Sequence, residues 1–368
     1  MINTSNSMLY RLDILNEQQT RVNYQMSSGK VLDNGSDDTV VYTQDLYIED
    51  KIRTFEGLKT QLEKNNAQND VADSTLEEIK NLLDYIKTET IKARNDTQNE
   101  DTRKAIAVQI QGAKENLFTL VNERVEDEYI FSGSQTNVEA FTQDADGKVT
   151  YNGNPQLRIA AVEIDSYRQR GVTGFDIMSY DVGTASTGSP LSFKEDERIV
   201  DQNGREWKLN EAESVLIEYD EDGKSTDNFV EVTVSGVSPD KVYDIADVGG
   251  SMRTFTVKHN TFDTIDDIIK SLNENEVEGI STGIDEMGEA YNSANHAHGQ
   301  LGGRNATFES AYERVISKLT HFNILSVENS SADLTKVAIE AKQLELTYTS
   351  LYSTISKMNS LSLVNFIN

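Results

Sequence analysis

The chain has 368 residues and a mass of 41.1 kDa, which is enough for two or three domains. Its 34 basic and 62 acidic residues give a formal charge of −28, which disfavours a general nucleic-acid-binding role because phosphate backbones would be repelled. Cysteine is absent, and this excludes disulfides, thiol nucleophiles, Fe–S clusters and cysteine-based zinc sites. Only 3 prolines occur, a composition that favours long helices because proline inside a helix costs about 3 kcal/mol.

The N-terminal region is patterned as helix. Polar and charged side chains interrupt residues 1–15, so we expect no cleaved signal peptide there. No part of the chain approaches 18 consecutive apolar residues, so we expect no membrane insertion. A partial heptad stripe is formed by Met8, Leu12, Leu15, Val22 and Met26.

Residues 40–95 carry an apolar stripe that is interrupted by the polar patch 65–70. Ser74 with Glu77 is a possible start of a new helix after the patch, but a single continuous helix is favoured. At 1.5 Å per residue, such a helix is on the order of 80 Å long. Thr97 with Glu100 predicts a capping box that opens the next helix.

The middle of the chain contains all three prolines and has the composition of strands and turns. Asp-Gly and Asn-Gly pairs separate alternating apolar runs, the strongest local signal for hairpins. The predicted strands cover residues 148–151, 157–164, 229–234 and 254–257.

The negative charge is concentrated in the same region. Residues 181–280 hold 23 acidic and 9 basic residues, a net charge of −14, whereas the first 40 residues net −2 and the last 40 net zero. The acidity therefore belongs to a central excursion, and the two ends of the chain are nearly neutral.

The C-terminal region repeats the heptad pattern over more than three heptads. One set of positions is Leu334, Ala341, Tyr348 and Ile355; three residues after each come Val337, Leu344, Leu351 and Met358. An earlier apolar stripe runs through residues 284–322. The two terminal stripes are expected to pack on each other, which brings the ends of the chain together.

The last eight residues include Phe366 among five apolar side chains. An isolated monomer would expose these side chains, so an end that folds on assembly is preferred to ordinary docking on its own body.

Motifs that carry chemistry are nearly missing. No nucleophile elbow, phosphate-binding glycine loop, zinc-protease or dinucleotide-binding motif occurs. His296 and His298 would share a face only on a strand, so structural roles are favoured over a metal site. Two acidic turns, at 144–147 and 220–223, lack the glutamate that a calcium loop needs at its twelfth position. We therefore expect no enzyme activity, no cofactor and no metal.

Four segments resemble motifs of the bacterial flagellin family, and of its hook–filament junction members in particular. The N-terminal segment has Ser28, Gly29 and Lys30 followed by Asp37 and Asp38; Arg94 and Asn95 come next; Phe131 and Gly133 lie in a segment that starts at Glu128; Arg304 and Asn305 follow a glycine pair. The chain end from Tyr348 to Ile367 is also similar to that of junction proteins. The resemblance covers roughly residues 1–180 and 282–368, and residues 181–280 depart from it as an enlarged outer domain.

The resemblance implies an α+β fold: a flagellin-like long-helix bundle with terminal coiled-coil helices and a central β-rich outer domain. The expected domains are 1–38 with 330–368 (terminal coiled coil), 39–135 with 282–329 (long helices) and 136–281 (β-rich). In the third domain, residues 136–180 would form family-like hairpins, and 181–281 the acidic insert. Asp37 and Asp38 are expected in the first turn of the following helix, where acidic side chains suit the helix dipole.

The resemblance further implies a structural subunit between hook and filament that is exported by the flagellar type III route and located outside the cell. Its implied partners are a neighbouring junction protein, filament flagellin, further copies in a ring and a cytoplasmic export chaperone. The expected assembly seam comprises Met8, Leu12, Leu15, Val22, Met26, Leu344, Leu351, Ile355, Met358 and Phe366. A minor filament flagellin and a secreted adhesin on a coiled-coil stalk are the alternatives; the first would polymerise alone, and the second would bind a glycan through residues 181–280.

Overall fold

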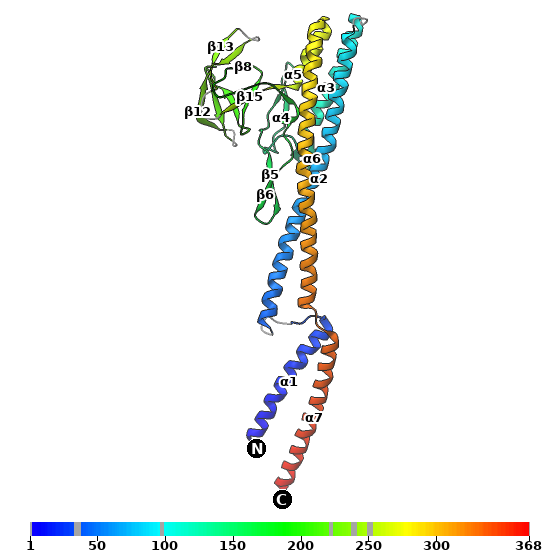
Figure 1. Ribbon diagram of the computed structural model, residues 1–368. Helices are drawn as coiled ribbons and strands as arrows, with labels where there is room; N and C mark the ends of the chain where they lie inside the picture. The colour runs from blue at the N-terminus through cyan, green and yellow to red at the C-terminus, as the bar shows by residue number, and fades with distance from the viewer. Residues whose placement is uncertain are drawn as a thin grey trace. The chain divides into compact units, whose positions relative to one another are not determined.

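The computed structural model describes residues 2–32, 38–95, 99–220, 224–236, 241–248 and 253–367 (Figure 1). The helices are α1 (Ile2–Ser28), α2 (Thr39–Arg94), α3 (Glu100–Val121), α4 (Gly174–Ile177), α5 (Thr261–Glu274), α6 (Val277–Ser330) and α7 (Leu334–Ile367). The early strands are β1 (Arg124–Val125), β2 (Glu128–Tyr129), β3 (Phe141–Gln143), β4 (Val149–Tyr151), β5 (Arg158–Glu163) and β6 (Ser166–Arg170). The later strands are β7 (Ser179–Ser186), β8 (Leu191–Lys194), β9 (Arg198–Asp201), β10 (Glu206–Leu209), β11 (Val215–Tyr219), β12 (Ser225–Glu231), β13 (Thr233–Ser235), β14 (Val242–Ile245) and β15 (Thr254–Asn260).

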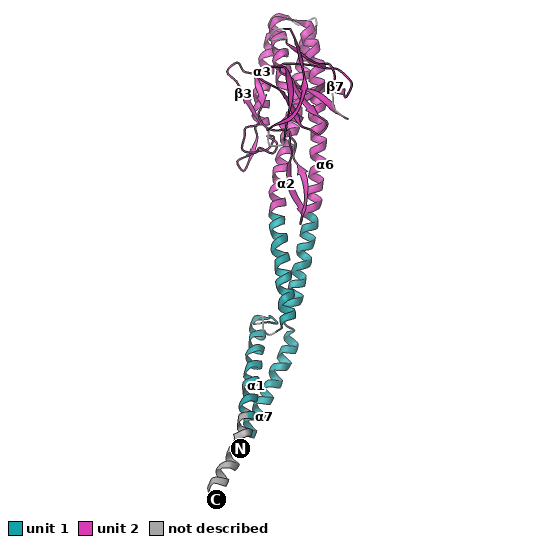
Figure 2. Ribbon diagram, turned by 90° about the vertical axis from the view of Figure 1, so that its left-hand side faces the viewer, with its two compact units in different colours: residues 1–60, 313–368 teal, residues 61–312 magenta. Residues whose placement is uncertain are grey.

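The predicted α+β class is confirmed, and so is the single long helix over residues 40–95. The chain divides into two compact units, shown in different colours in Figure 2: unit 1 is Met1–Thr60 with Glu313–Asn368, and unit 2 is Gln61–Tyr312. Helices α2 and α6 each run through both units. None of the described helices combines the length and the apolarity needed to cross a membrane.

Unit 1 contains two helix pairs. In the first, the ends of α2 and α6 pack through an apolar stripe that includes Ile48, Phe55 and Val315, all buried. Phe55 also stacks on Phe322 with ring centroids 5.6 Å apart. The second pair, α1 with α7, is the candidate assembly surface and is described below.

Unit 2 is built on a larger core. Helices α2, α3, α5 and α6 contribute side chains that are fully buried, among them Leu83, Ile110, Ile268 and Leu301. Helix α3 begins at Glu100 with Asn99 as its N-cap, since the Asn99 side chain accepts a hydrogen bond from the Thr102 amide. The predicted capping box is therefore wrong about the capping residue, and Thr97 itself lies outside the described residues.

The polar patch 65–70 of α2 has a partner in the hairpin β5–β6. The Arg170 guanidinium donates to the side chains of Asn65 and Gln68, all three of which are buried. Arg158, on the paired strand, forms an ion pair with Glu128 at 3.0 Å, and Gln68 also donates to Glu128. Burial lowers the pKa of Arg170 to about 10, so the side chain stays charged at neutral pH. The patch does not break the helix. Its polar side chains instead bind the guanidinium group of Arg170, which lies about a hundred residues further along the chain.

Residues of the acidic excursion form two antiparallel sheets. One has the strand order β12-β11-β10-β9-β15-β7 and the other β13-β14-β8. Their shared core includes Phe193, Trp207, Tyr243 and Phe255, with Phe193 stacked on Tyr243 at 5.2 Å and Trp207 tilted against Phe255 at 4.9 Å. We refer to residues 179–260 as the β insert. It has a closed core of its own.

Most predicted strands are present, with one correction. The predicted strand 229–234 is two strands: Val232 is buried between β12 and β13, which belong to different sheets. The turn before β4 forms as expected, because the Asp144 carboxylate accepts from the amides of Asp146 and Lys148.

Candidate assembly surface

Helices α1 and α7 pack side by side through a small apolar cluster. Val22, Val337 and Leu344 are buried in it, and Leu15, Ala332 and Ala341 pack against them. All except Ala332, which precedes α7, occupy heptad positions, so the structure brings these parts of the two terminal stripes together. The ends of the chain meet in unit 1 as the pattern predicts.

Polar contacts set the register of this pair. Arg21 on α1 and Glu340 on α7 lie 2.5 Å apart, and the Tyr348 hydroxyl donates to the Asn16 side chain at 2.6 Å. The ion pair is about 40% exposed on both sides, so its contribution to stability is of order 0.2–1 kcal/mol. Neither contact can substitute for apolar burial.

Much of the predicted seam is only partly covered within one chain. Leu12, Leu351 and Ile355 are half-buried. Met26 is 51% exposed and does not join the α1–α7 cluster, so its place in an assembly seam stays a prediction. The side chains of Met8, Met358 and Phe366 lie outside the described residues.

An open groove follows the two helices beyond the buried cluster. Its volume is about 790 Å³, and its lining combines Ile14, Leu15, Leu346 and Leu351 with small hydroxyl side chains. Arg11 also lines the groove, so the groove that the described residues of this chain leave open combines apolar, hydroxyl and basic side chains.

The Ser-Gly-Lys motif ends α1 and fastens it to the start of α7. Gly29 adopts a φ of +68° and donates its amide to the carbonyl of Gln25, as expected of a residue just past a helix end. Ser28 accepts from the Lys30 amide. Lys30 forms an antiparallel bridge with Ser331, and the flanking amides of Val31 and Ala332 complete two hydrogen bonds of 2.8 Å. The segment that follows α1 (residues 29–31) is thus hydrogen-bonded to the segment between α6 and α7 (residues 330–332).

Asp38 acts just before α2 and not inside it. Its carboxylate accepts from the amides of Val40 and Val41, which makes it the N-cap of a helix that begins at Thr39. The sequence predicted Asp38 in the first turn of α2; the structure places it one residue earlier, at the N-cap. Asp37 lies outside the described residues.

The remaining motif residues have structural positions in unit 2. Arg94 is the last residue of α2, and Asn95 follows it with its amide bonded to Lys92. Phe131 is fully buried, and Gly133 has a φ of +72° where a Cβ would collide with the backbone oxygen of Asn154.

Arg304 on α6 donates to the carbonyl of Gly171 at 2.8 Å, and burial lowers its pKa. Beside it, the Asn305 Oδ1 is buried and has no hydrogen-bond partner in the described part of the chain. The structure does not bring any of these residues to the α1–α7 pair.

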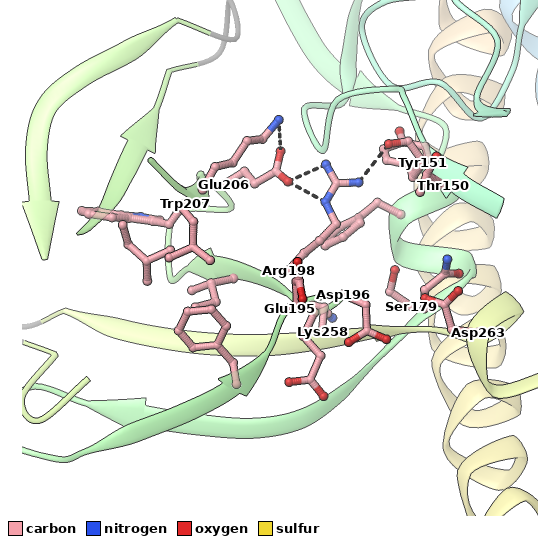
Figure 3. Close-up of a pocket in the computed structure, with 18 of the residues that line it drawn as sticks. Thr150, Tyr151, Ser179, Glu195, Asp196, Arg198, Glu206, Trp207, Lys258 and Asp263 are labelled. Carbon is pink, nitrogen blue, oxygen red and sulfur yellow. Dashed lines mark hydrogen bonds and ion pairs between the residues drawn. The ribbon is translucent and has the colours of Figure 1, made fainter. Parts of the chain in front are cut away.

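A cavity in unit 2 is lined by charged and aromatic side chains. It measures about 390 Å³ and lies between the β insert and the turn region of β3–β4, with Tyr151, Phe175 and Trp207 in its lining (Figure 3). Its Arg198 is bonded to Glu206 at 2.5 Å and donates to the Tyr151 carbonyl at 3.1 Å. Lys208 also lies 3.3 Å from Glu206. These side chains bond one another across the cavity, as the dashed lines in Figure 3 show.

Titratable groups gather where the β insert joins α5. His259 Nδ1 lies 3.6 Å from the Glu197 carboxylate, and both side chains are buried. Burial alone would lower the pKa of His259, but the bond to Glu197 and nearby Asp196 and Asp263 raise it. Burial raises the pKa of Asp263 to about 6. Among the described residues, no group of three or more carboxylates or imidazoles is arranged to hold a metal ion.

Comparison with known proteins points to the bacterial flagellum. Residues 2–136 match the bacterial flagellin N-terminal helical region. The chain is also similar to flagellar hook-associated protein 3 of Salmonella typhimurium, 28% identical over 167 residues, 42% of this chain and 48% of that protein. The Escherichia coli protein of the same name is 28% identical over 155 residues, 38% of this chain and 46% of its own length.

The chain spans about half the length of the curated relatives it matches. Among solved structures, a Vibrio parahaemolyticus protein described as a flagellar hook-associated protein is similar in fold, with a TM-score of 0.55 and 12% identity. The alignment covers 80% of this chain and all of that one. At this identity the likeness concerns the fold alone.

Proposed function

We propose that this chain belongs to the bacterial flagellin family and is a structural subunit of the flagellum that forms the junction between hook and filament. The observation that carries the proposal is the α1–α7 pair, which presents an open groove in a chain similar to hook-associated protein 3. Apolar side chains that one copy leaves uncovered gain free energy when a second copy covers them, at about 25 cal/mol per Å².

Charge supports assembly at the ends. Two copies of a chain with a formal charge of −28 repel each other unless their contact lies where charge is low. The first 40 residues net −2 and the last 40 net zero, so the helices α1 and α7 can approach other chains. The β insert holds 17 acidic and 8 basic residues, a net charge of −9, and would then face water, where salt screens this charge.

The proposal includes partners and location. A junction subunit must contact the hook-associated protein on one side, filament flagellin on the other and further copies of itself in a ring. We further propose export through the flagellar type III route, chaperone protection of the C-terminal helix inside the cell, and an extracellular place in the flagellum. The proposed role is structural and not catalytic, in keeping with the similarity to flagellar hook-associated proteins.

A paired set of variants tests the proposal. Replacing Leu351 and Ile355 by Asp puts two charges on the half-buried seam, whereas S353D with S356D adds the same charges at exposed positions of α7. The seam variant should be secreted but should leave filaments detached from hooks, and the control should support normal swimming. Normal filaments in cells with the seam variant would contradict the proposal. A purified chain that polymerises alone into long filaments would instead indicate a minor flagellin.

A further inference from the structure

Within unit 1, the C-terminal part of α6 carries two apolar stripes. Only one of them packs on α2. The first stripe, with Val315 and Phe322, packs on α2 as described above. The second is offset by about 100° around the helix and consists of Ile316, Thr320, Ile324 and Val327, which we call the outer stripe. Spacings of four, four and three residues keep these side chains on one face.

The outer stripe is open to solvent in this chain. Ile324 is 52% exposed and Val327 62%, and with Thr320, Asn323 and Glu328 they line a shallow depression. A helix with a second apolar face normally packs against a second neighbour. The described residues of the chain leave this face uncovered.

A matching surface lies on α2. Tyr47 is 57% exposed and Leu46 49%, and Val40 is exposed one heptad before Tyr47. Contacts between the two helices show that they run antiparallel: the Asn329 side chain donates to the Val41 carbonyl, and Phe322 stacks on Phe55. This register places Leu46 and Tyr47 at the level of Val327, so both exposed surfaces occupy the same stretch of unit 1.

Charge favours another copy of this chain as the occupant. Residues 313–330 carry two acidic and two basic side chains, and residues 39–60 carry four acidic and three basic side chains. Residues 277–312 of the same α6 carry five acidic and one basic. The apolar stripes thus lie on the low-charge stretch of both helices, where copies that are otherwise strongly negative can approach each other.

We infer that the outer stripe of α6 in one copy packs against the Leu46–Tyr47 surface of α2 in the next copy. The inference rests on the proposed function, in which copies stand side by side, and names a contact separate from the α1–α7 groove. Two different surfaces meet in this contact, so it is heterologous and can continue from copy to copy around a ring.

Cysteine cross-linking tests the inference directly, because the natural chain contains no cysteine. Cells would co-express the full chain as V327C with either L46C or Y47C, and purified flagella would be oxidised. A disulfide between unlike chains is expected, since it requires Cα atoms within about 7 Å. V108C, at an exposed apolar position of α3, is the control and should not cross-link with V327C.

The outcomes separate this inference from the proposed function. Flagella that contain the chain at the junction without a cross-link to either α2 position would overturn the inference and leave the junction role standing. A cross-link between two V327C chains only would also overturn it, because that product requires a two-fold contact. Absence of the chain from purified flagella would contradict both.

A charge variant supplies a second readout. I324D with V327D should reduce the amount of chain retained in flagella on the order of tenfold, because two carboxylates replace an apolar contact. Circular dichroism of the purified variant should match the natural chain, since both positions are exposed. Unchanged retention in flagella would count against the inference.

Discussion

The terminal pair α1–α7 and the β insert are stabilised in different ways. The β insert encloses a core of large side chains such as Trp207, Tyr243 and Phe255 between two sheets. The terminal pair buries only Val22, Val337 and Leu344 among its described residues and leaves a groove open. The insert therefore carries its own stability, whereas under the proposed function the terminal pair gains further burial from other chains. The charge follows the same division: it is high on the self-contained part and near zero on the dependent part.

The substitution Phe255→Ala is expected to have the largest effect on stability, and to affect the β insert without affecting the terminal pair α1–α7. The ring is fully buried against Trp207, so its removal should destabilise the β insert by about 3–5 kcal/mol. Thermal unfolding followed by the fluorescence of Trp207, the single tryptophan, reports on the insert. Because the contacts of the terminal pair lie elsewhere, junctions should still form in cells. Loss of the junction at permissive temperature would show that the two regions are not independent.

The next effect concerns the shared framework of unit 2. Gly133→Ala forces an L side chain into a left-handed conformation and against Asn154, at a cost of about 1–3 kcal/mol from strain alone. Gly112→Ala, in α3 with open space around it, is the matched control and should stabilise by about 0.4–1 kcal/mol. Denaturant unfolding measures both. Equal effects of the two substitutions would contradict the assignment of Gly133 as a conformational requirement.

A smaller effect depends on pH at the base of the β insert. The pKa of Asp263, raised by burial to about 6 with Asp196 and Asp266 nearby, means that the folded chain binds a proton more tightly than the unfolded chain. Stability should therefore fall as pH rises through about 6. Lys148 and His259 also face this carboxyl and oppose the shift.

Asp263→Asn removes this penalty. The variant should gain about 1–2 kcal/mol at pH 7 and little at pH 4, where the natural side chain is protonated. Melting temperatures at pH 4, 5, 6 and 7 provide the comparison. A variant that parallels the natural chain across this range would refute the role of Asp263.

The smallest effect is expected within the terminal pair. Glu340→Gln removes the ion pair with Arg21, which is partly exposed and should contribute only about 0.2–1 kcal/mol. Junction formation in cells should be unchanged at physiological salt. A strong assembly defect would mean that polar register contacts, and not apolar side chains, hold the terminal pair.

Sequence patterns predicted the long helices well because heptad spacing and scarce proline act locally. The pairing of the terminal stripes also followed, since Leu15, Val22 and Leu344 have no local partner. The polar patch 65–70 could not be understood in this way: its partner Arg170 comes from a distant hairpin, and spacing carries no information about it. The same holds for the N-cap of α3, where Thr97 and Asn99 are equally suitable types and only the backbone path distinguishes them.

The α1–α7 packing within one chain was predicted in part. Heptad positions identified Val22 and Leu344, but they also included Met26, which the end of α1 leaves exposed. The outer stripe of α6 was missed. The spacing of the outer stripe is present in the sequence. However, each of its residues lies close in sequence to a residue of the stripe that packs on α2, so the two stripes look like one broad apolar face. Only the exposed fractions of the side chains distinguish them.

The proposed place of this chain is the boundary between hook and filament. Electron microscopy of purified flagella, labelled with an antibody against the β insert, locates the chain directly. We expect a single labelled zone at the hook–filament boundary, lost when the chain is deleted. Label along the length of the filament, or none on flagella that carry hooks and filaments, would contradict it.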